Sequence, residues 1–216
     1  MRLHALMIPF LLAGGCGPIN AVPGTTENRS FAAKDFNRVA LKGADNVNII
    51  IGPAFSVRAI GPQNILDNLD ITVENGTLKI ARKSKNGLSV QWNSTSAVVT
   101  VTMPAIIGAD VAGSGDLDID AIAADNLELN IAGSGNIGAA GTAKNLKIGL
   151  AGSGDVNVQK LSAQTADISV AGSGNVSAHA TKSAAISIIG SGDVMVSGTA
   201  QCAISKIGSG DARCTL

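Results

Sequence analysis

Aromatic side chains are scarce in this chain of 216 residues, which has no Tyr, one Trp and four Phe. Its 16 acidic residues balance its 16 basic residues, and the basic residues form no cluster. Nucleic-acid binding relies on a basic patch and often on aromatic platforms, so this class of function has no support. The same scarcity argues against a lectin surface on which sugar rings stack on aromatic side chains.

Residue types that form catalytic and metal sites are also few. Of the two His residues, His4 lies near the N-terminus, and His179 stands between two alanines at a position that we expect to face solvent. No second His or free Cys is placed to build a metal cage or a nucleophile–base pair. The densest acidic group is Asp116, Asp118 and Asp120, which has the spacing of one outward strand edge. We therefore expect no cofactor, no metal and no enzymatic activity.

The most informative feature that is present is a repeated phrase. Gly-Ser-Gly-Asp or Gly-Ser-Gly-Asn occurs six times in the second half of the chain, with starts 18 to 20 residues apart. The copies begin at Gly113, Gly133, Gly152, Gly172, Gly190 and Gly208. A fixed period of this length indicates a solenoid, in which each repeat is a coil that buries its apolar side by stacking on its neighbours.

Apolar residues alternate with polar or small residues on both sides of each copy. Leu117 and Ile119 follow the first motif in this way, and Leu127, Leu129 and Ile131 precede the second. A period of two is typical of strands with one buried face. A repeat of about twenty residues holds two or three short strands with turns, but not the crossover helix of a βαβ unit. The predicted fold is therefore all-β: a single-stranded, right-handed parallel β-helix with coils of 18–20 residues.

The last residue of each motif should stack into a column along one corner of the solenoid. This Asp/Asn column consists of Asp116, Asn136, Asp155, Asn175, Asp193 and Asp211. Asp and Asn side chains hydrogen-bond neighbouring backbone groups at turns, so we interpret the column as a structural turn ladder. Calcium binding between turns is the alternative, since some Gly- and Asp-rich repeats bind calcium there. The two neutral Asn residues, and the lack of Asp in the opposite turns, favour the ladder.

Residues 31–112 are β-like but carry no repeated phrase. Asn75-Gly76 lies between two apolar segments and predicts a hairpin turn. The strand-sized segments are Phe36–Leu41, Val47–Ile51, Val57–Ile60, Ile71–Val73, Leu78–Ile80, Leu88–Trp92 and Val98–Met103, and residues 64–68 could form one helical turn. We expect residues 31–112 to be the opening coils and cap of the solenoid whose regular coils are residues 113–216, within one domain of residues 31–216. A separate small β domain is the alternative.

The N-terminus has the pattern of an export signal. Met1-Arg2 precedes an apolar run of about ten residues, which is too short for a bilayer that needs roughly 20. Leu12-Ala13-Gly14-Gly15-Cys16 resembles a bacterial lipoprotein signal, which implies cleavage before Cys16 and a diacylglycerol on its thiol, although Ala13 stands where Leu is usual. Residues 1–15 would then be the signal peptide and residues 16–30 a flexible tether. Ordinary cleavage after Ala21, which discards Cys16, is the alternative.

Two further cysteines lie near the C-terminus, and export places them in an oxidising environment. Cys202 and Cys214 both fall on inward registers and flank the motif that begins at Gly208. We expect them to form a disulfide across the core of the final coil. Two buried free thiols that act as small apolar side chains are the alternative.

Several segments, taken in order, resemble a known family. They are Phe36-Asn37-Arg38-Val39, Val47-Asn48-Ile49, the stretch from Ile71 to Ile80 and the stretch from Val99 to Pro104, followed by the tandem motifs. Over about residues 31–214 the chain resembles the bacterial family called "putative auto-transporter adhesin, head GIN domain". The resemblance implies a parallel β-helix and an exported, often lipid-anchored protein. It implies no established activity and assigns no functional residue.

These observations predict a non-enzymatic cell-envelope protein at the outer membrane, in the periplasm or on the cell surface, held by lipid at Cys16. It would present a polar β-helix surface to an envelope or extracellular partner, protein or glycan, as an adhesin or a sensing module. Its contact with the membrane would be through the lipid only. The alternative is a carbohydrate-active β-helix enzyme, either a polysaccharide lyase or a hydrolase. A groove lined by carboxylates and faced by a basic residue would favour the enzyme, and a polar face without a groove would favour the binding protein.

Overall fold

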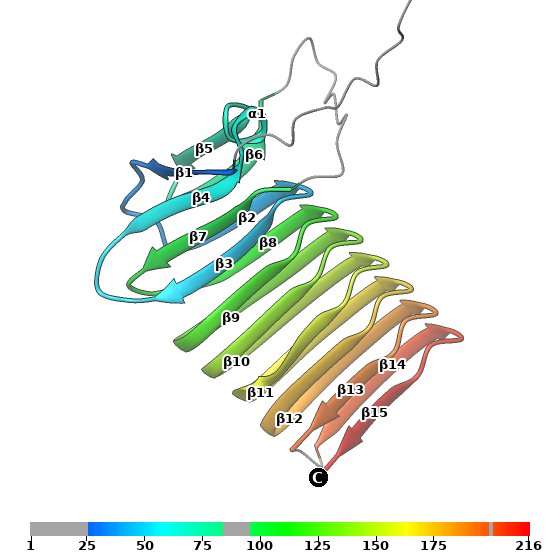
Figure 1. The fold of residues 1–216 in the computed structure, drawn as a ribbon. Coiled ribbons are helices and arrows are strands. Elements are labelled where there is room, and N and C mark those ends of the chain that lie inside the picture. The colour runs from blue at the N-terminus through cyan, green and yellow to red at the C-terminus, as the bar shows by residue number, and fades with distance from the viewer. Residues whose placement is uncertain (1–25, 84–95, 199–200) are drawn as a thin grey trace, which may run out of the picture.

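Residues 26–83, 96–198 and 201–216 are described by the computed structural model of the protein (Figure 1). Fifteen strands belong to one sheet, which winds into a β-solenoid of about five turns. Figure 1 shows the coils stacked side by side, with the less regular N-terminal strands at one end. The all-β parallel solenoid predicted from the repeats is confirmed. No helix in the described ranges is long and apolar enough to cross a membrane.

Each regular coil consists largely of one long, bent strand. These strands are β9 (Leu117–Gly133), β10 (Ile137–Gly152), β11 (Val156–Gly172) and β12 (Val176–Gly190), followed by the shorter β13 (Val194–Ser197), β14 (Cys202–Gly208) and β15 (Ala212–Thr215). We expected two or three separate strands per coil. In the structure the parallel pairing of β9 with β10 continues through the bend within each long strand. A register shift between Ala139 and Gly141 lies at this bend.

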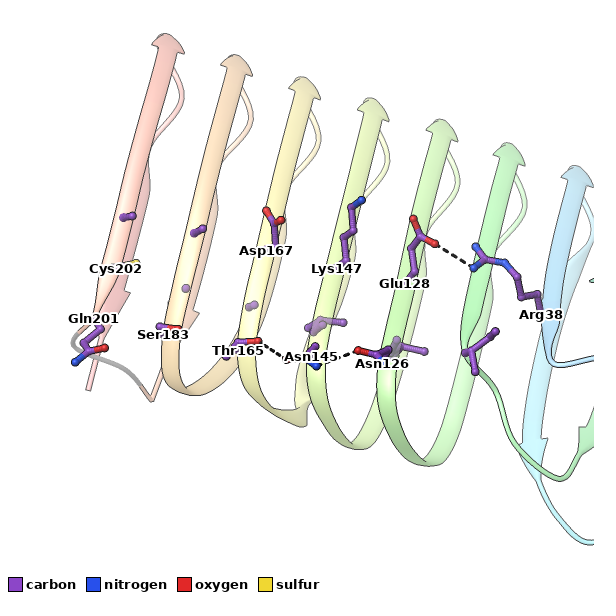
Figure 2. A pocket seen from close by; sticks show the side chains of 17 residues that line it. Arg38, Asn126, Glu128, Asn145, Lys147, Thr165, Asp167, Ser183, Gln201 and Cys202 are labelled. Carbon is purple, nitrogen blue, oxygen red and sulfur yellow. Dashed lines mark hydrogen bonds and ion pairs between the residues drawn. The ribbon is translucent and has the colours of Figure 1, made fainter.

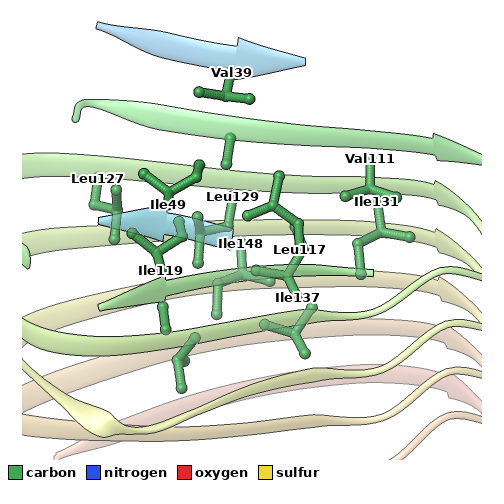
Figure 3. Packing of buried hydrophobic residues seen from close by; sticks show 14 of the residues in the cluster. Val39, Ile49, Val111, Leu117, Ile119, Leu127, Leu129, Ile131, Ile137 and Ile148 are labelled. Atoms are coloured by element: carbon green, nitrogen blue, oxygen red, sulfur yellow. The ribbon is translucent and has the colours of Figure 1, made fainter. Parts of the chain in front are cut away.

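Every long strand contributes two segments that line opposite sides of a narrow apolar core. We call the segments before each motif, such as residues 126–133, the pre-motif face, and the segments after it, such as residues 117–120, the post-motif face. Parallel pairing with coil-to-coil register places like residues together, as in Leu129 and Ile148 on the first face and Leu117 and Ile137 on the second. All four are buried in one cluster (Figure 3). Burial of these branched side chains is the main term that stabilises the stack.

The first coil of the solenoid pairs with strands that follow much later in the chain. It is formed by β2 (Arg38–Gly43) and β3 (Asn46–Ile51). Strand β2 pairs in parallel with β8 (Gly108–Gly113), and β3 pairs in parallel with β9. Gly43 is thus the register partner of Gly113, although the two lie 70 residues apart (113 minus 43).

The intervening residues form a cap at this end. They comprise β4 (Ser56–Pro62), α1 (Gln63–Leu66), β5 (Leu69–Glu74), β6 (Thr77–Arg82) and β7 (Val98–Met103). Strands β6 and β7 pair in parallel with β2 and β3 and so add one more layer. Strands β5 and β4 then pair antiparallel with β6 and β7. The predicted Asn-Gly hairpin is confirmed between β5 and β6, because Asn75 and Gly76 both have positive φ, of 50° and 74°.

One predicted boundary needs correction. Strand β1 (Thr26–Phe31) pairs antiparallel with β4, so residues 26–30 belong to the sheet and not to a flexible tether. The alternation of polar and apolar residues in Thr26–Phe31 is weak, which explains why the sequence did not indicate this strand. The expected strand Leu88–Trp92 and the signal region with Cys16 lie outside the described residues.

Candidate functional site

The motif corner is built from backbone contacts between successive coils. The first glycine of each copy has positive φ, as in Gly113 with 136° and Gly133 with 140°. Its carbonyl oxygen accepts two backbone hydrogen bonds from the next motif: Gly113 O accepts from Ser134 N at 2.9 Å and from Gly135 N at 3.0 Å. The corners therefore stack directly on one another, and the motif residues are fixed by this stacking.

The Asp/Asn column forms a hydrogen-bonded ladder along this corner. Asp155 N donates to Asn136 Oδ1 at 3.0 Å, and Asn175 N donates to Asp155 Oδ1 at 2.9 Å. The same backbone-to-side-chain bond links every neighbouring pair from Asp116 to Asp211. In each pair, one side-chain oxygen is already occupied by a backbone N–H. Among the residues that the structure describes, no group of three or more His, Cys, Asp or Glu is placed to hold a metal ion.

A seventh, degenerate copy of the motif was missed by sequence reasoning. Gly43-Ala44-Asp45-Asn46 stacks on the first regular copy: Gly43 has φ 122°, and Asn46 Oδ1 accepts a hydrogen bond from Asp116 N at 3.3 Å. Asn46 is thus the first member of the ladder. The available signal was the strand alternation on both sides of this phrase. The absent second glycine concealed it.

Asp45 occupies the position of that second glycine and is fully buried. Its two carboxylate oxygens accept hydrogen bonds from Arg82 Nε at 2.9 Å and Arg82 Nη2 at 2.7 Å, and Ala97 N donates to it at 2.8 Å. The hydrogen bond from the guanidinium to Asp45 raises the pKa of Arg82. This bidentate pair ties the first coil to both strands of the cap layer, since Arg82 ends β6 and Ala97 precedes β7.

At the opposite end of the stack, the last coil (residues 201–216) closes the apolar core. Cys202 on β14 and Cys214 on β15 are joined as a disulfide, with their Cα atoms 6.4 Å apart. The register partner of the buried Ile188 is Lys206. Lys206 Nζ donates to Gly210 O at 3.1 Å. The stem of a lysine can cover apolar surface while its ammonium group stays hydrated, so Lys206 suits the end of the stack.

A groove of about 940 Å³ lies on the pre-motif face and crosses several coils. Figure 2 shows its side chains in two columns along the stack. The neutral column consists of Asn126, Asn145, Thr165, Ser183 and Gln201, and the charged column begins with Arg38, Glu128, Lys147 and Asp167 and continues with Ala185 and Ala203. Buried residues between them, such as Leu127 and Leu146, form the floor.

The neutral column is a second hydrogen-bonded ladder, which sequence reasoning also missed. Asn145 Nδ2 donates to Asn126 Oδ1 at 2.9 Å, and Thr165 Oγ1 donates to Asn145 Oδ1 at 3.0 Å. Its members differ in residue type and precede the strand pattern that marks each repeat, so no repeated letter indicates them. Their coil-to-coil register is visible only when the coils are stacked.

Arg38 begins the charged column by reaching across one coil. Its register partner Gly108 has no side chain, and a Cβ there would collide with the guanidinium. Arg38 Nη1 therefore reaches Glu128 Oε2 at 3.0 Å, and Nη2 lies 3.3 Å from Asp110 Oδ2. The hydrogen bond from Arg38 lowers the pKa of Glu128.

Lys147 and Asp167 continue the charged column and are exposed. Neither side chain makes a hydrogen bond or an ion pair with another described residue, although the charge of Lys147 contributes, after the hydrogen bond from Arg38, to the lowered pKa of Glu128. The charged column thus has two parts. Arg38 and Glu128 form an ion pair, and Lys147 and Asp167 line the groove beyond that pair.

The other residues considered in the sequence do not form a site. Asp118 and Asp120 are exposed on the post-motif face, whereas Asp116 is held in the ladder, so the three carboxylates do not converge. His179 lies on the outward register that we expected, between the buried Ala178 and Ala180, but it is not fully solvated. Its ring is half-buried, and its Nδ1 lies 3.0 Å from Ser197 Oγ in the next coil. Ser197 Oγ also donates to Ala178 O at 3.4 Å, so this contact is a link between coils.

Comparison with known proteins places this β-solenoid in a family. The chain belongs to the family described as "putative auto-transporter adhesin, head GIN domain", whose sequence pattern matches residues 35–200. The resemblance inferred from the sequence is confirmed. No functionally curated protein matches the chain.

Several solved structures share the fold. A "putative adhesin" from Bacteroides fragilis is 22% identical, with a TM-score of 0.69, and the match covers 89% of this chain and 97% of that one. A "putative lipid binding protein" from Parabacteroides distasonis is 24% identical, with a TM-score of 0.56 and coverage of 89% and 97%. A "putative adhesin" from Parabacteroides merdae is 16% identical, with a TM-score of 0.57 and coverage of 90% and 98%. At these identities the likeness shows the fold alone.

Proposed function

We propose that the protein is a non-enzymatic binding protein of the bacterial cell envelope, which presents the groove of its pre-motif face to a partner. The observation that carries this proposal is the groove itself, which has the neutral ladder on one side and Lys147 and Asp167 on the other. The side chains of these two residues make no hydrogen bond or ion pair with another described residue. The description of the family as adhesins supports the same class of function. Rigid coils hold the polar groups in fixed register, which reduces the entropy lost on binding.

The groove also has carboxylates with a basic residue nearby, which is the arrangement that we expected to favour an enzyme. A glycoside hydrolase needs one carboxyl group whose pKa is raised, so that it can protonate the leaving oxygen. The pKa of Glu128 is lowered instead, because Arg38 donates a hydrogen bond to it. Glu128 is therefore an ionised partner of Arg38 and a poor general acid, which disfavours a hydrolase that uses this carboxylate as its acid.

We also propose that lipid on Cys16 holds the domain at the membrane, with the residues before β1 as a linker. Replacement of the lipidated thiol in Cys16→Ala should move the protein from the membrane fraction to the soluble fraction. Mass spectrometry of the wild-type N-terminus should show a diacylglyceryl cysteine. An unmodified N-terminus at Val22 would instead establish ordinary signal cleavage.

The binding proposal can be tested with the full chain in its soluble Cys16→Ala form. Fluorescently labelled protein should bind envelope fragments, and the double variant Lys147→Ala/Asp167→Ala should bind much less. The matched control is Asp118→Ala/Lys160→Ala, which removes one anion and one cation that are exposed outside the groove. Equal binding by both variants would contradict the proposal, and release of reducing sugars from envelope polysaccharide would identify an enzyme.

A further inference from the structure

We propose that the groove binds an extended, uncharged glycan chain that lies parallel to the solenoid axis. This inference rests on the proposed function, because it names the ligand of the same groove. It is carried by the spacing of the two columns, by their charge and by the hydrogen-bonding groups that remain available on them.

The spacing favours a chain of sugar rings. Neighbouring coils lie about 4.8 Å apart, so the five residues of the neutral column span about 19 Å with one polar group per coil. A pyranose ring advances an extended glycan by a comparable distance and presents hydroxyl groups at every step. An extended peptide repeats its side chains on one face only every ~6.7 Å, which is out of step with the coils.

The surface also disfavours a peptide that adds as a strand. Strand addition requires a free sheet edge with unpaired backbone groups. The groove lies across the middle of the sheet, where β9, β10, β11 and β12 are already paired with each other in parallel. Only side chains are available to a ligand there, and side-chain amides, hydroxyls and charges suit the hydroxyl groups of a sugar.

The charges of the groove cancel along the charged column. Cations and anions alternate along this column, in the order Arg38, Glu128, Lys147 and Asp167. Such an alternating column creates no strong field of one sign, so it does not favour phosphate groups of nucleic acids or lipids. Lys147 can donate and Asp167 can accept charge-assisted hydrogen bonds with neutral hydroxyls.

The neutral column keeps hydrogen-bonding capacity after its internal bonds are made. Each Asn amide has two N–H donors, and Asn145 uses one of them on Asn126. The hydroxyl group of Ser183 makes no hydrogen bond with another described residue. With no aromatic residue lining the groove, binding would depend on the hydrogen bonds of the two columns and not on ring stacking. The affinity of one or two sugars should therefore be weak and should grow with each coil that the chain contacts.

Calorimetric titration of the soluble full chain with neutral oligosaccharides tests this inference. The probes are cello-, manno- and galacto-oligosaccharides of increasing length, with oligogalacturonate, phosphatidylglycerol vesicles and a random-coil peptide as comparisons. At least one neutral series should bind, with affinity that rises up to about five sugars, one for each coil of the groove, and then levels off. Added salt should change this affinity little, since the ligand carries no charge.

The groove variant provides the structural control. Lys147→Ala/Asp167→Ala should weaken binding of the neutral glycan by roughly tenfold or more, as expected for the loss of charge-assisted hydrogen bonds. Asp118→Ala/Lys160→Ala should leave the affinity within about twofold of wild type, since both side chains lie outside the groove. Circular dichroism should show that both variants retain the fold.

The outcomes separate the two proposals. Binding only to oligogalacturonate, vesicles or peptide, or to no probe at all, would overturn the glycan inference. If the groove variant loses envelope binding while no neutral glycan competes, the proposed function stands and the glycan inference fails. If a neutral glycan binds the groove but envelope binding does not depend on it, the glycan site stands and the proposed function fails.

Discussion

The carbonyl oxygen of Gly135 lies against the Cα atom of Gly154 in the next coil, in the space that a Cβ atom would occupy. The second glycine of the motif is therefore required by contact and not by backbone conformation, because Gly154 has no positive φ. The first glycine, Gly152, has both constraints, with φ 136° and the carbonyl of Gly133 against it. The two glycines of one motif thus have different physical roles.

This contact predicts the order of two neighbouring substitutions. Gly154→Val should lower the free energy of unfolding by about 3 kcal/mol or more, because the two coils would have to separate. Asp155→Asn should cost less than about 1 kcal/mol, because the amide oxygen can still accept the hydrogen bond from Asn175 N. Chemical denaturation of both variants measures the difference. The reverse order, or a folded Asp155→Asn protein that no longer binds envelope, would show that the column is a binding site.

The buried pair at the cap gives a second prediction. Asp45→Ala should destabilise the protein by about 3–5 kcal/mol, since it removes a fully buried carboxylate that accepts two hydrogen bonds from Arg82 and one from Ala97 N. The control is Asp125→Ala, which removes an exposed carboxylate 2.8 Å from Lys144 Nζ and should cost about 0–1 kcal/mol. Hydrogen exchange should show that the Asp45 variant loses protection first in β6 and β7. Equal costs for the two variants would contradict the proposed role of the cap pair.

The disulfide gives a third prediction. Peptide mapping of exported protein without reductant should recover Cys202 and Cys214 as one linked peptide pair. The bond closes a loop of 12 residues, so its loss should cost on the order of 3 kcal/mol. Reduction should loosen β14 and β15 before the central coils, which exchange of their amide hydrogens would detect. Two thiols that react with an alkylating agent in the folded protein would disprove the disulfide.

The regular coils were predictable because every local signal repeats. The glycines, the Asp/Asn column and the alternating apolar residues all recur with the same period, so one register satisfies them all. The strands of the first coil were predicted, but its register was not, because the pairing with β8 joins residues 70 positions apart and Asp45 replaces the second glycine. The order of the cap layers depends on this long-range pairing, which no local pattern specifies.

The groove could not be predicted for a related reason. Its columns combine Asn, Thr, Ser and Gln, or Arg, Glu, Lys and Asp, so no single residue type continues along either column. The contact between Arg38 and Glu128 also spans 90 residues and needs Gly108 to leave room for the guanidinium. The proposed binding surface thus consists of residues that vary from coil to coil, whereas the fold depends on residues that repeat.

The Arg38–Glu128 pair predicts a pH dependence of stability. The pKa of Glu128 is lowered in the folded state, so its ionised form stabilises the fold above its unfolded pKa, and this stabilisation is lost as the pH falls below about 4. Because 38% of the side chain is exposed, solvent screens the pair and the effect should be about 0.5–1 kcal/mol. Unfolding of Glu128→Gln and wild type should differ by this amount at pH 7 and converge near pH 3. A constant difference would contradict the assignment.

The Asp/Asn column predicts that calcium leaves stability unchanged. In each step of the ladder a backbone N–H occupies one side-chain oxygen, and acidic residues are separated by Asn until the last two coils. Asp193 and Asp211 form the one pair of adjacent carboxylates in the column, and cations already lie near Asp211: Lys206 Nζ at 3.4 Å and Arg213 Nη2 at 3.5 Å. These cations oppose the approach of calcium.

Thermal unfolding should therefore have the same midpoint with millimolar calcium and with a chelator. A rise of several degrees would mean that calcium binds the native state, because such binding must stabilise it. Asp211→Asn would then show whether the site lies at that pair: the rise would vanish in this variant if it does, and would persist if calcium binds elsewhere along the column.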